Sequence, residues 1–202
     1  MEFRKAKITD VEAIHALITY YAEKGLMLAR PRTLLYESLR EFTIACDGDK
    51  VIAAGSLHII WEDLAEIRAL AVAPEYTGQG VGQQLVKMFL EEARELAIPQ
   101  VFVLTYQQKF FEKCGFKVIS KESLPQKVWK ECVNCPKFPN CEEIAMMCLE
   151  NKKMGLEHKE KVISRIKENR EIISLDVDYL PKDIVGLMNT VLKDRLMYKK
   201  EI

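Results

Sequence analysis

The chain lacks an excess of charge of either sign, because its 202 residues include 30 Lys and Arg against 30 Asp and Glu. A net charge near zero gives no electrostatic reason to expect binding to nucleic acid or to an anionic membrane. The first residues, Met1-Glu2-Phe3-Arg4-Lys5, lack the apolar core of a signal peptide, and no apolar run is as long as a membrane span. We therefore expect a cytoplasmic protein whose partners are small molecules.

Two common nucleotide-binding motifs are also missing. The glycine-rich segment is not closed by the Gly-Lys-Ser/Thr of a P-loop, and it lacks the further glycine and the downstream acid of the dinucleotide fingerprint. Instead, an apolar run at residues 70–73 leads through a short turn to Gly78, Gly80 and Gly82. Without Cβ atoms, successive N–H groups can converge on an anion, and a helix over residues 80–96 adds its positive end. The segment predicts a site for a diphosphate-bearing cofactor, although such turns also occur in ordinary loops.

This segment resembles the acetyl-CoA pyrophosphate loop of the GNAT N-acetyltransferase superfamily, which reads Gln/Arg-x-x-Gly-x-Gly/Ala after a strand that ends in Val-x-Pro. Thr77 stands here where the family usually has Gln or Arg. The family's second landmark, Phe-Tyr-x-x-x-Gly-Phe, resembles residues 110–116, with Phe111 in place of the tyrosine. The resemblance implies acetyl-CoA as cosubstrate. It assigns the binding of acetyl-CoA to Leu70, Ala71, Val72, Thr77, Gly78, Gln79, Gly80, Val81, Gly82, Gln83 and Phe110.

Periodicity predicts an α/β (α+β) domain over residues 1–150, and the order of its elements matches a GNAT fold. That fold is a mixed, mostly antiparallel sheet flanked by helices. Thr9 and Glu12 fit a capping box at the start of the first helix. Strands are expected at residues 3–6, 42–46, 51–61, 65–73, 100–105 and 143–149, and helices at residues 11–23, 32–40, 80–96 and 110–115.

Acetyl transfer to an amine requires a proton acceptor, a polarised thioester carbonyl and a proton for the leaving thiolate. Glu66 lies just before the strand segment assigned to the cofactor, and we predict that it is the general base. The alternative is a structural Glu66 that is solvated or paired with Arg68. Phe111 cannot donate a proton, so Thr105 and Tyr106 are the nearest hydroxyl candidates for the acid, with solvent as the alternative.

A closer resemblance is to the GNAT domain of the N-acetylglutamate synthase family, and it covers residues 3–150. Residues 25–30 resemble the family's Leu-x-x-Arg element, in which the arginine clamps a substrate carboxylate. Residues 66–72 resemble its base-bearing strand. The resemblance implies substrate contacts from Leu28, Arg30, Ala69 and Lys127. Arginine suits this role because its planar guanidinium binds a carboxylate in bidentate fashion.

The predicted function is therefore direct acetyl transfer from acetyl-CoA to the α-amine of glutamate, a step of arginine synthesis. Two alternatives stay open. One is acetylation of another small amine or of a protein amine, and the other is a non-catalytic CoA sensor or adaptor.

Three cysteines, Cys132, Cys135 and Cys141, have ligand-like spacing within a cysteine-rich loop at residues 130–142. In a cytoplasmic chain such spacing favours a metal over a disulfide, and a structural zinc is the prediction. Cys148 and His158 are candidates for the fourth ligand. An iron–sulfur cluster and a loop of free thiols are the alternatives.

Residues 151–202 lie outside the resemblance and predict a helical C-terminal extension, with helices at residues 157–173 and 181–198. The second helix carries an apolar stripe, which calls for a partner surface. That surface is either the GNAT domain itself or a second subunit, so a homodimer is one of the expectations.

Overall fold

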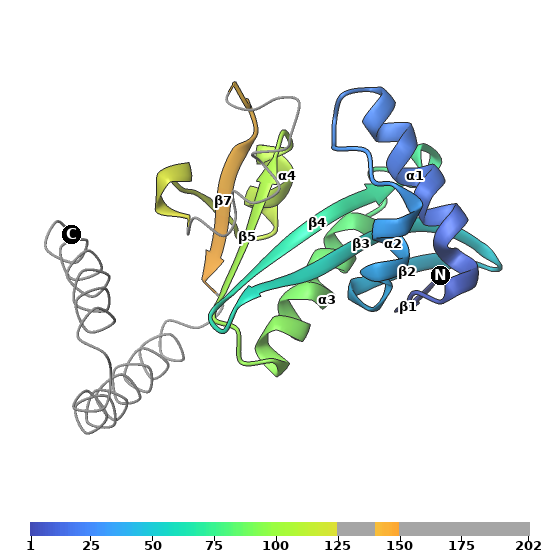
Figure 1. Cartoon of the computed structure of the whole chain (residues 1–202), viewed down its shortest axis with the longest axis horizontal. Helices are drawn as coiled ribbons and strands as arrows, with labels where there is room; N and C mark the ends of the chain where they lie inside the picture. Colours follow the sequence, from blue (N-terminus) through green and yellow to red (C-terminus); the bar gives the residue numbers. More distant parts are fainter. Residues whose placement is uncertain (125–139, 150–202) are drawn as a thin grey trace, which may run out of the picture. The chain divides into compact units, whose positions relative to one another are not determined.

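The computed structural model describes residues 1–124 and 140–149. Figure 1 shows the elements in chain order: β1 (Glu2–Lys5), α1 (Val11–Glu23), α2 (Arg32–Glu37), β2 (Phe42–Asp47), β3 (Lys50–Trp61), β4 (Leu64–Val72), α3 (Val81–Glu95), β5 (Gln100–Thr105), α4 (Gln108–Lys113), β6 (Lys117–Val118) and β7 (Ile144–Leu149). The described residues belong to one unit, Met1–Gly155. The helices expected at residues 157–173 and 181–198 lie outside the described residues. Within the described part, no helix is long and apolar enough to cross a membrane.

The strands form one seven-stranded sheet in the order β1-β2-β3-β4-β5-β7-β6. β4 and β5 are parallel and are connected through α3, whereas the other neighbouring strands are antiparallel. A parallel pair needs a crossover of this kind, because a tight turn can join only antiparallel strands. The expected mixed, mostly antiparallel sheet with flanking helices is confirmed.

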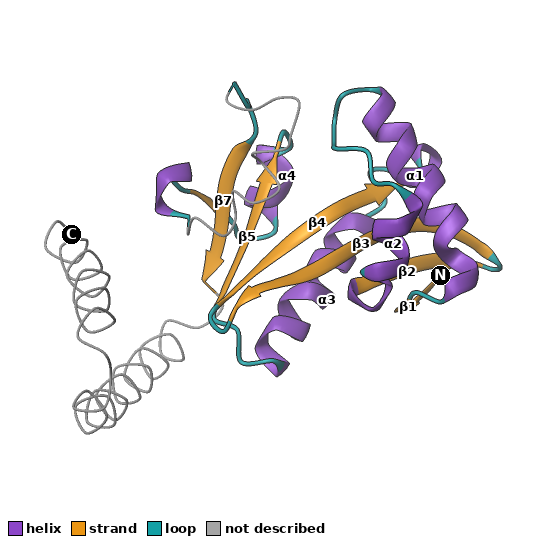
Figure 2. Cartoon of the chain, in the orientation of Figure 1, coloured by secondary structure: helices purple, strands orange, loops and turns teal. Residues whose placement is uncertain are grey.

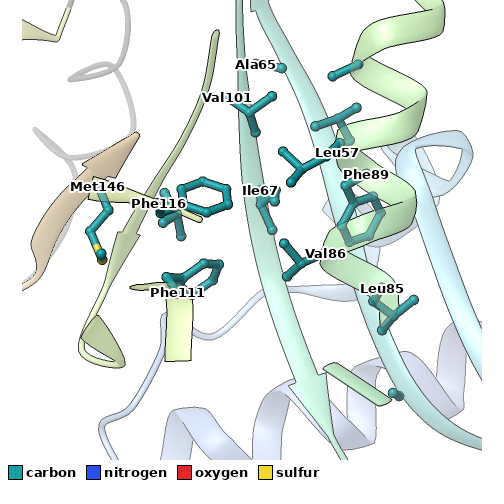
Figure 3. Packing of buried hydrophobic residues seen from close by; sticks show 14 of the residues in the cluster. Leu57, Ala65, Ile67, Leu85, Val86, Phe89, Val101, Phe111, Phe116 and Met146 are labelled. Atoms are coloured by element: carbon teal, nitrogen blue, oxygen red, sulfur yellow. The ribbon is translucent and has the colours of Figure 1, made fainter. Parts of the chain in front are cut away.

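Helices cover both faces of the sheet, with α1 and α2 on one face and α3 on the other (Figure 2). On the α3 side, Ala65 and Ile67 of β4 pack against Val86 and Phe89 (Figure 3). These strand residues are two apart and the helix residues three apart, which matches the side-chain periods of the two elements. Glu66 lies between Ala65 and Ile67, so its side chain leaves the opposite face of β4.

Two local predictions need correction. The helix expected over residues 32–40 ends at Glu37 and is followed by a 3₁₀ turn, Leu39–Glu41. The capping box of Thr9 and Glu12 does not form, because α1 is preceded by a 3₁₀ turn and has no side-chain cap. Asp10 makes the side-chain contacts before α1 instead, with Arg4 and with Lys7 N–H.

A β-bulge interrupts β4 where the resemblance places cofactor and substrate contacts. Between Ala54 and Ser56 the register shifts, so that Gly55 lies opposite both Ala69 and Leu70. Ala69 has a φ of 50°, in the left-handed region. A bulge of this kind removes backbone groups from the ladder and redirects the strand.

Candidate active site

The parallel pairing of β4 and β5 extends over only three residues on each strand, Leu64–Glu66 and Gln100–Phe102. Beyond these residues the two strands diverge (Figure 1). A cavity of about 910 Å³ lies here, lined by both strands, the loop after α1, the start of α3, and α4. β5 does not pair with β4 after Glu66, and no other strand among the described residues pairs with this edge of β4. Such an edge suits an extended ligand.

The glycine segment forms one wall of the cavity. Gly78 and Gly80 have φ values of 76° and 82°, a conformation that glycine adopts without strain. Gln84 N–H donates to the Gly80 carbonyl at 3.0 Å as α3 begins, so the N–H groups of Val81 and Gly82 precede the helical ladder. These donors and the positive end of α3 suit a diphosphate.

Gly82 has no positive φ, unlike Gly78 and Gly80, so it serves a different purpose in the motif. It lies within the first turn of α3, and an added Cβ would come within 3.2 Å of the Phe110 ring and 3.4 Å of Val72. Gly82 therefore allows close packing between α3, α4 and β4 rather than a left-handed turn. The Phe110 ring also packs edge-on against Phe111, with centroids 5.0 Å apart.

The two polar residues of the loop make contacts within the loop. The Thr77 hydroxyl donates to the Pro74 carbonyl at 2.7 Å, and Gln79 Nε2 donates to the Glu75 carbonyl at 2.9 Å. Thr77 lines the cavity and Gln79 does not. Both side chains therefore stabilise the loop itself, so that its backbone N–H groups are the predicted anion-binding groups.

Glu66 lines the cavity and forms an ion pair with Arg68, whose Nε lies 2.5 Å from Glu66 Oε2. The two side chains are only 11% and 9% exposed. Pairing with Arg68 was the structural alternative to a catalytic Glu66. The structure shows this pair, and the role of Glu66 as general base stays a prediction. The paired carboxylate lies on the cavity wall at the last β4 residue that pairs with β5.

Thr105 is buried at the end of β5 and lines the cavity. Its Oγ1 accepts a hydrogen bond from Gln107 N–H at 2.9 Å. That bond occupies an acceptor position of the hydroxyl, so the hydroxyl proton remains available for donation. Tyr106, the second candidate for the acid, is not among the residues that line the cavity.

The predicted substrate contacts meet the cavity from two directions. Leu28 and Arg30 line it from the loop after α1, and Ala69 lines it from the bulge of β4. Lys127 lies outside the described residues. Leu28 and Arg30 thus reach the same cavity as Ala69, which lies about 40 positions further along the chain.

Several cavity residues were not predicted from the sequence. Tyr21 lines the cavity, and its hydroxyl donates to the Val72 carbonyl at 2.5 Å. Burial raises the pKa of the Tyr21 phenol, which keeps it a donor. The sequence predicts Tyr21 only as part of the helix at residues 11–23. Charged residues of the later segments also line the cavity: Lys109, Lys113, Lys121, Glu122 and Glu143.

Of the predicted metal ligands, Cys141 lies in the described part of the chain, and Cys132 and Cys135 lie outside it. Cys141 Sγ donates to Glu143 Oε2 at 3.6 Å. Among residues 1–124 and 140–149, no group of three or more His, Cys, Asp or Glu side chains could hold a metal ion. The zinc site stays a prediction.

One cavity combines the glycine loop at residues 77–82 (the glycine cradle), a buried carboxylate and an oriented hydroxyl. Comparison with known proteins agrees with this geometry. The sequence matches the Acetyltransferase (GNAT) family over residues 11–116. An uncharacterised N-acetyltransferase of Chlorobaculum tepidum is 40% identical over 144 residues, which cover 71% of this chain and 93% of that protein. The chain therefore belongs to the GNAT acetyltransferase family, and the predicted enzyme class, an acyltransferase, is confirmed.

Some relatives within the family have names that state a more specific activity. An amino-acid acetyltransferase of Mycobacterium tuberculosis is 40% identical over 131 residues, covering 63% of this chain and 75% of that protein. A solved M. tuberculosis structure in complex with CoA and NLQ matches with a TM-score of 0.65 and 34% identity, covering 74% of this chain and 99% of that one. N-acetylglutamate synthase of Neisseria gonorrhoeae, complexed with coenzyme A and N-acetyl-glutamate, matches with a TM-score of 0.69 and 25% identity. That match covers 75% of this chain and 35% of the synthase. The resemblance to its GNAT domain is confirmed.

Proposed function

We propose that the protein uses acetyl-CoA to acetylate the α-amino group of an amino acid, with L-glutamate as the preferred substrate and arginine biosynthesis as its setting. One observation carries the proposal. Glu66 and Arg30 line the same cavity as the glycine cradle. A cavity with these three features can hold a diphosphate, accept a proton and bind a carboxylate.

The cradle and the open edge of β4 fit acetyl-CoA. The diphosphate would meet the N–H groups at the start of α3, and the amides of the extended pantetheine arm suit the strand edge that β5 leaves unpaired. When bound, acetyl-CoA supplies a thioester carbonyl that an amine can attack.

The chain's own residues would handle the protons. The Glu66 carboxylate accepts a proton from the substrate ammonium, directly or through a water, and so produces the neutral nucleophile. The Thr105 hydroxyl, oriented by Gln107 N–H, donates a hydrogen bond to the developing thiolate. A threonine hydroxyl is a weak acid, so Thr105 would polarise or relay while solvent supplies the proton.

The proposal can be tested by measuring thiol release from acetyl-CoA. The acceptors are glutamate and a panel of other amino acids and carboxylate-free amines. We expect turnover selective for glutamate. Arg30→Ala should raise KM for glutamate at least 10-fold, because it removes a charged hydrogen-bond donor worth about 1.5–3 kcal/mol. Arg32→Ala is the matched control, since Arg32 pairs with Glu12 on the surface and does not line the cavity.

Glu66→Gln tests the general base in the same assay. We expect kcat to fall by about 10²-fold or more at neutral pH, with partial recovery at high pH, where more of the amine is already deprotonated. Binding of acetyl-CoA without turnover of any amine would instead support a sensor. Efficient turnover of a carboxylate-free amine would keep the acetyltransferase and reject the substrate.

A further inference from the structure

The ion pair between Glu66 and Arg68 lies in an unusual place for a structural salt bridge. Both side chains leave the same face of β4, two residues apart, and both line the cavity at the point where β4 and β5 separate. Burying two charges costs desolvation energy that can exceed their mutual attraction. A nearly buried pair on a cavity wall therefore points to a role in binding rather than in folding.

The chemistry of the pair complements one particular kind of ligand. It presents a carboxylate and a guanidinium side by side, with Nε and Oε2 2.5 Å apart. An α-amino acid carries the opposite arrangement, an ammonium and a carboxylate on one carbon atom. A guanidinium has five N–H donors in a planar fork and can therefore bind more than one carboxylate at the same time.

We propose that Glu66 and Arg68 together recognise the head group of an α-amino acid, Glu66 through the ammonium and Arg68 through the α-carboxylate. Arg30, which reaches the cavity from the separate loop after α1, then binds the side-chain carboxylate. This assignment rests on the proposed function and deepens it, because it explains how the cavity would distinguish an α-amino acid from a simple amine. It also gives Arg68 a substrate contact that the sequence motifs do not imply.

Two substrate analogues separate the roles of the two arginines. Isoglutamine carries an amide in place of the α-carboxylate, and glutamine carries an amide in place of the γ-carboxylate. We would measure kcat/KM for glutamate, isoglutamine and glutamine with the wild-type protein, Arg68→Gln, Arg30→Gln and the surface control Arg32→Gln. The wild type should prefer glutamate over isoglutamine by about 10- to 100-fold, the usual worth of a charged hydrogen bond.

Arg68→Gln should reduce the preference for glutamate over isoglutamine to about 3-fold or less while the preference for glutamate over glutamine persists. Arg30→Gln should show the reverse pattern, and Arg32→Gln should change neither ratio. If Arg68→Gln lowers kcat/KM for glutamate and isoglutamine by the same factor, Arg68 acts only through Glu66 and the inference is wrong. A wild-type protein that turns over no amino acid would overturn the proposed function and the inference with it.

Removal of Arg68 alone leaves the Glu66 charge buried, which can prevent folding. The double variant Glu66→Gln/Arg68→Gln removes both charges and keeps hydrogen-bonding side chains at both positions. Calorimetric binding of glutamate and isoglutamine to this variant, in the presence of CoA, should give Kd values within about 3-fold of each other. A retained preference of 10-fold or more for glutamate would place the α-carboxylate elsewhere and overturn the inference.

Discussion

The Tyr21 hydroxyl donates to the carbonyl of Val72 at 2.5 Å and so joins α1 to the last residue of β4. The loop that carries Arg30 begins just after α1, and the glycine cradle follows β4 in the chain. One hydrogen bond thus connects the segment proposed to bind the substrate with the segment proposed to bind acetyl-CoA.

Tyr21→Phe removes this hydrogen bond and little else. We expect a several-fold increase in KM for acetyl-CoA and a loss of about 1 kcal/mol in the free energy of unfolding, the usual net value of one hydrogen bond. Steady-state kinetics and chemical denaturation measure the two effects. Tyr20→Phe is a control of the same type, because Tyr20 does not line the cavity.

The pH dependence of this bond follows from the raised pKa of the Tyr21 phenol, which burial causes. A raised pKa in the folded state means that the contribution to stability is present below the unfolded pKa and is lost only as pH rises through the folded value. The stability difference between wild type and Tyr21→Phe should therefore be constant from pH 7 to pH 9. A decline within that range would contradict the assignment.

Asp10 connects β1 to α1. Its carboxylate accepts hydrogen bonds from the Arg4 guanidinium at 2.7 and 3.0 Å and from Lys7 N–H at 2.6 Å. The Arg4 hydrogen bonds lower the pKa of Asp10 below its usual value. Asp10→Asn should destabilise the protein by about 1–3 kcal/mol at pH 7, because it leaves the partly buried Arg4 without its charged partner.

The lowered pKa of Asp10 determines how the stability loss in Asp10→Asn depends on pH. A lowered pKa contributes stability that is present above the unfolded value and is lost as pH falls through the folded value. Unfolding curves should therefore show a deficit in Asp10→Asn that is constant at neutral pH and shrinks on acidification. A deficit independent of pH down to pH 3 would mean that packing, rather than the ion pair, is lost.

The cradle should be sensitive to a side chain at Gly80. Gly80→Ala places a Cβ on a residue with a φ of 82°, which costs about 1 kcal/mol and disturbs the N–H groups that precede α3. We expect weaker binding of CoA, measured by calorimetry. Gly48→Ala provides a matched control, because Gly48 has a φ of 59° in the β2–β3 turn and does not line the cavity. We expect Gly48→Ala to lose as much stability as Gly80→Ala and to bind CoA with unchanged affinity.

Thr105 can be tested by near-isosteric replacement. Thr105→Val removes both the acceptor for Gln107 N–H and the donor toward the thiolate, so kcat should fall by about 10-fold or more. Thr105→Ser keeps the hydroxyl and should retain most of the activity. Pre-steady-state measurement of thiol release distinguishes a slower chemical step from slower product release. Unchanged kcat in the valine variant would mean that Thr105 neither polarises the thiolate nor relays the proton from solvent.

Much of the fold could be predicted because local rules determine it. The alternation of apolar residues around Ala65 and Ile67 and the helical spacing of Leu85 and Phe89 indicate which side faces the core. The glycine loop is equally local, because a positive φ at Gly78 and Gly80 is a property of single residues. Helix ends were less predictable, since Asp10 rather than Thr9 makes the contacts before α1.

The sequence by itself therefore determined the family, the order of the strands along the chain and the position of the cradle, all of which depend on neighbouring residues. Only the tertiary structure decided that β4 and β5 separate after Glu66, that the pair of Glu66 and Arg68 forms and lines the resulting cavity, and that Tyr21 reaches Val72. These relationships depend on how distant segments pack in three dimensions. The sequence offered the pairing of Arg68 with Glu66 only as an alternative and Tyr21 only as a helix residue, because a linear pattern carries no information about which other segments lie beside them.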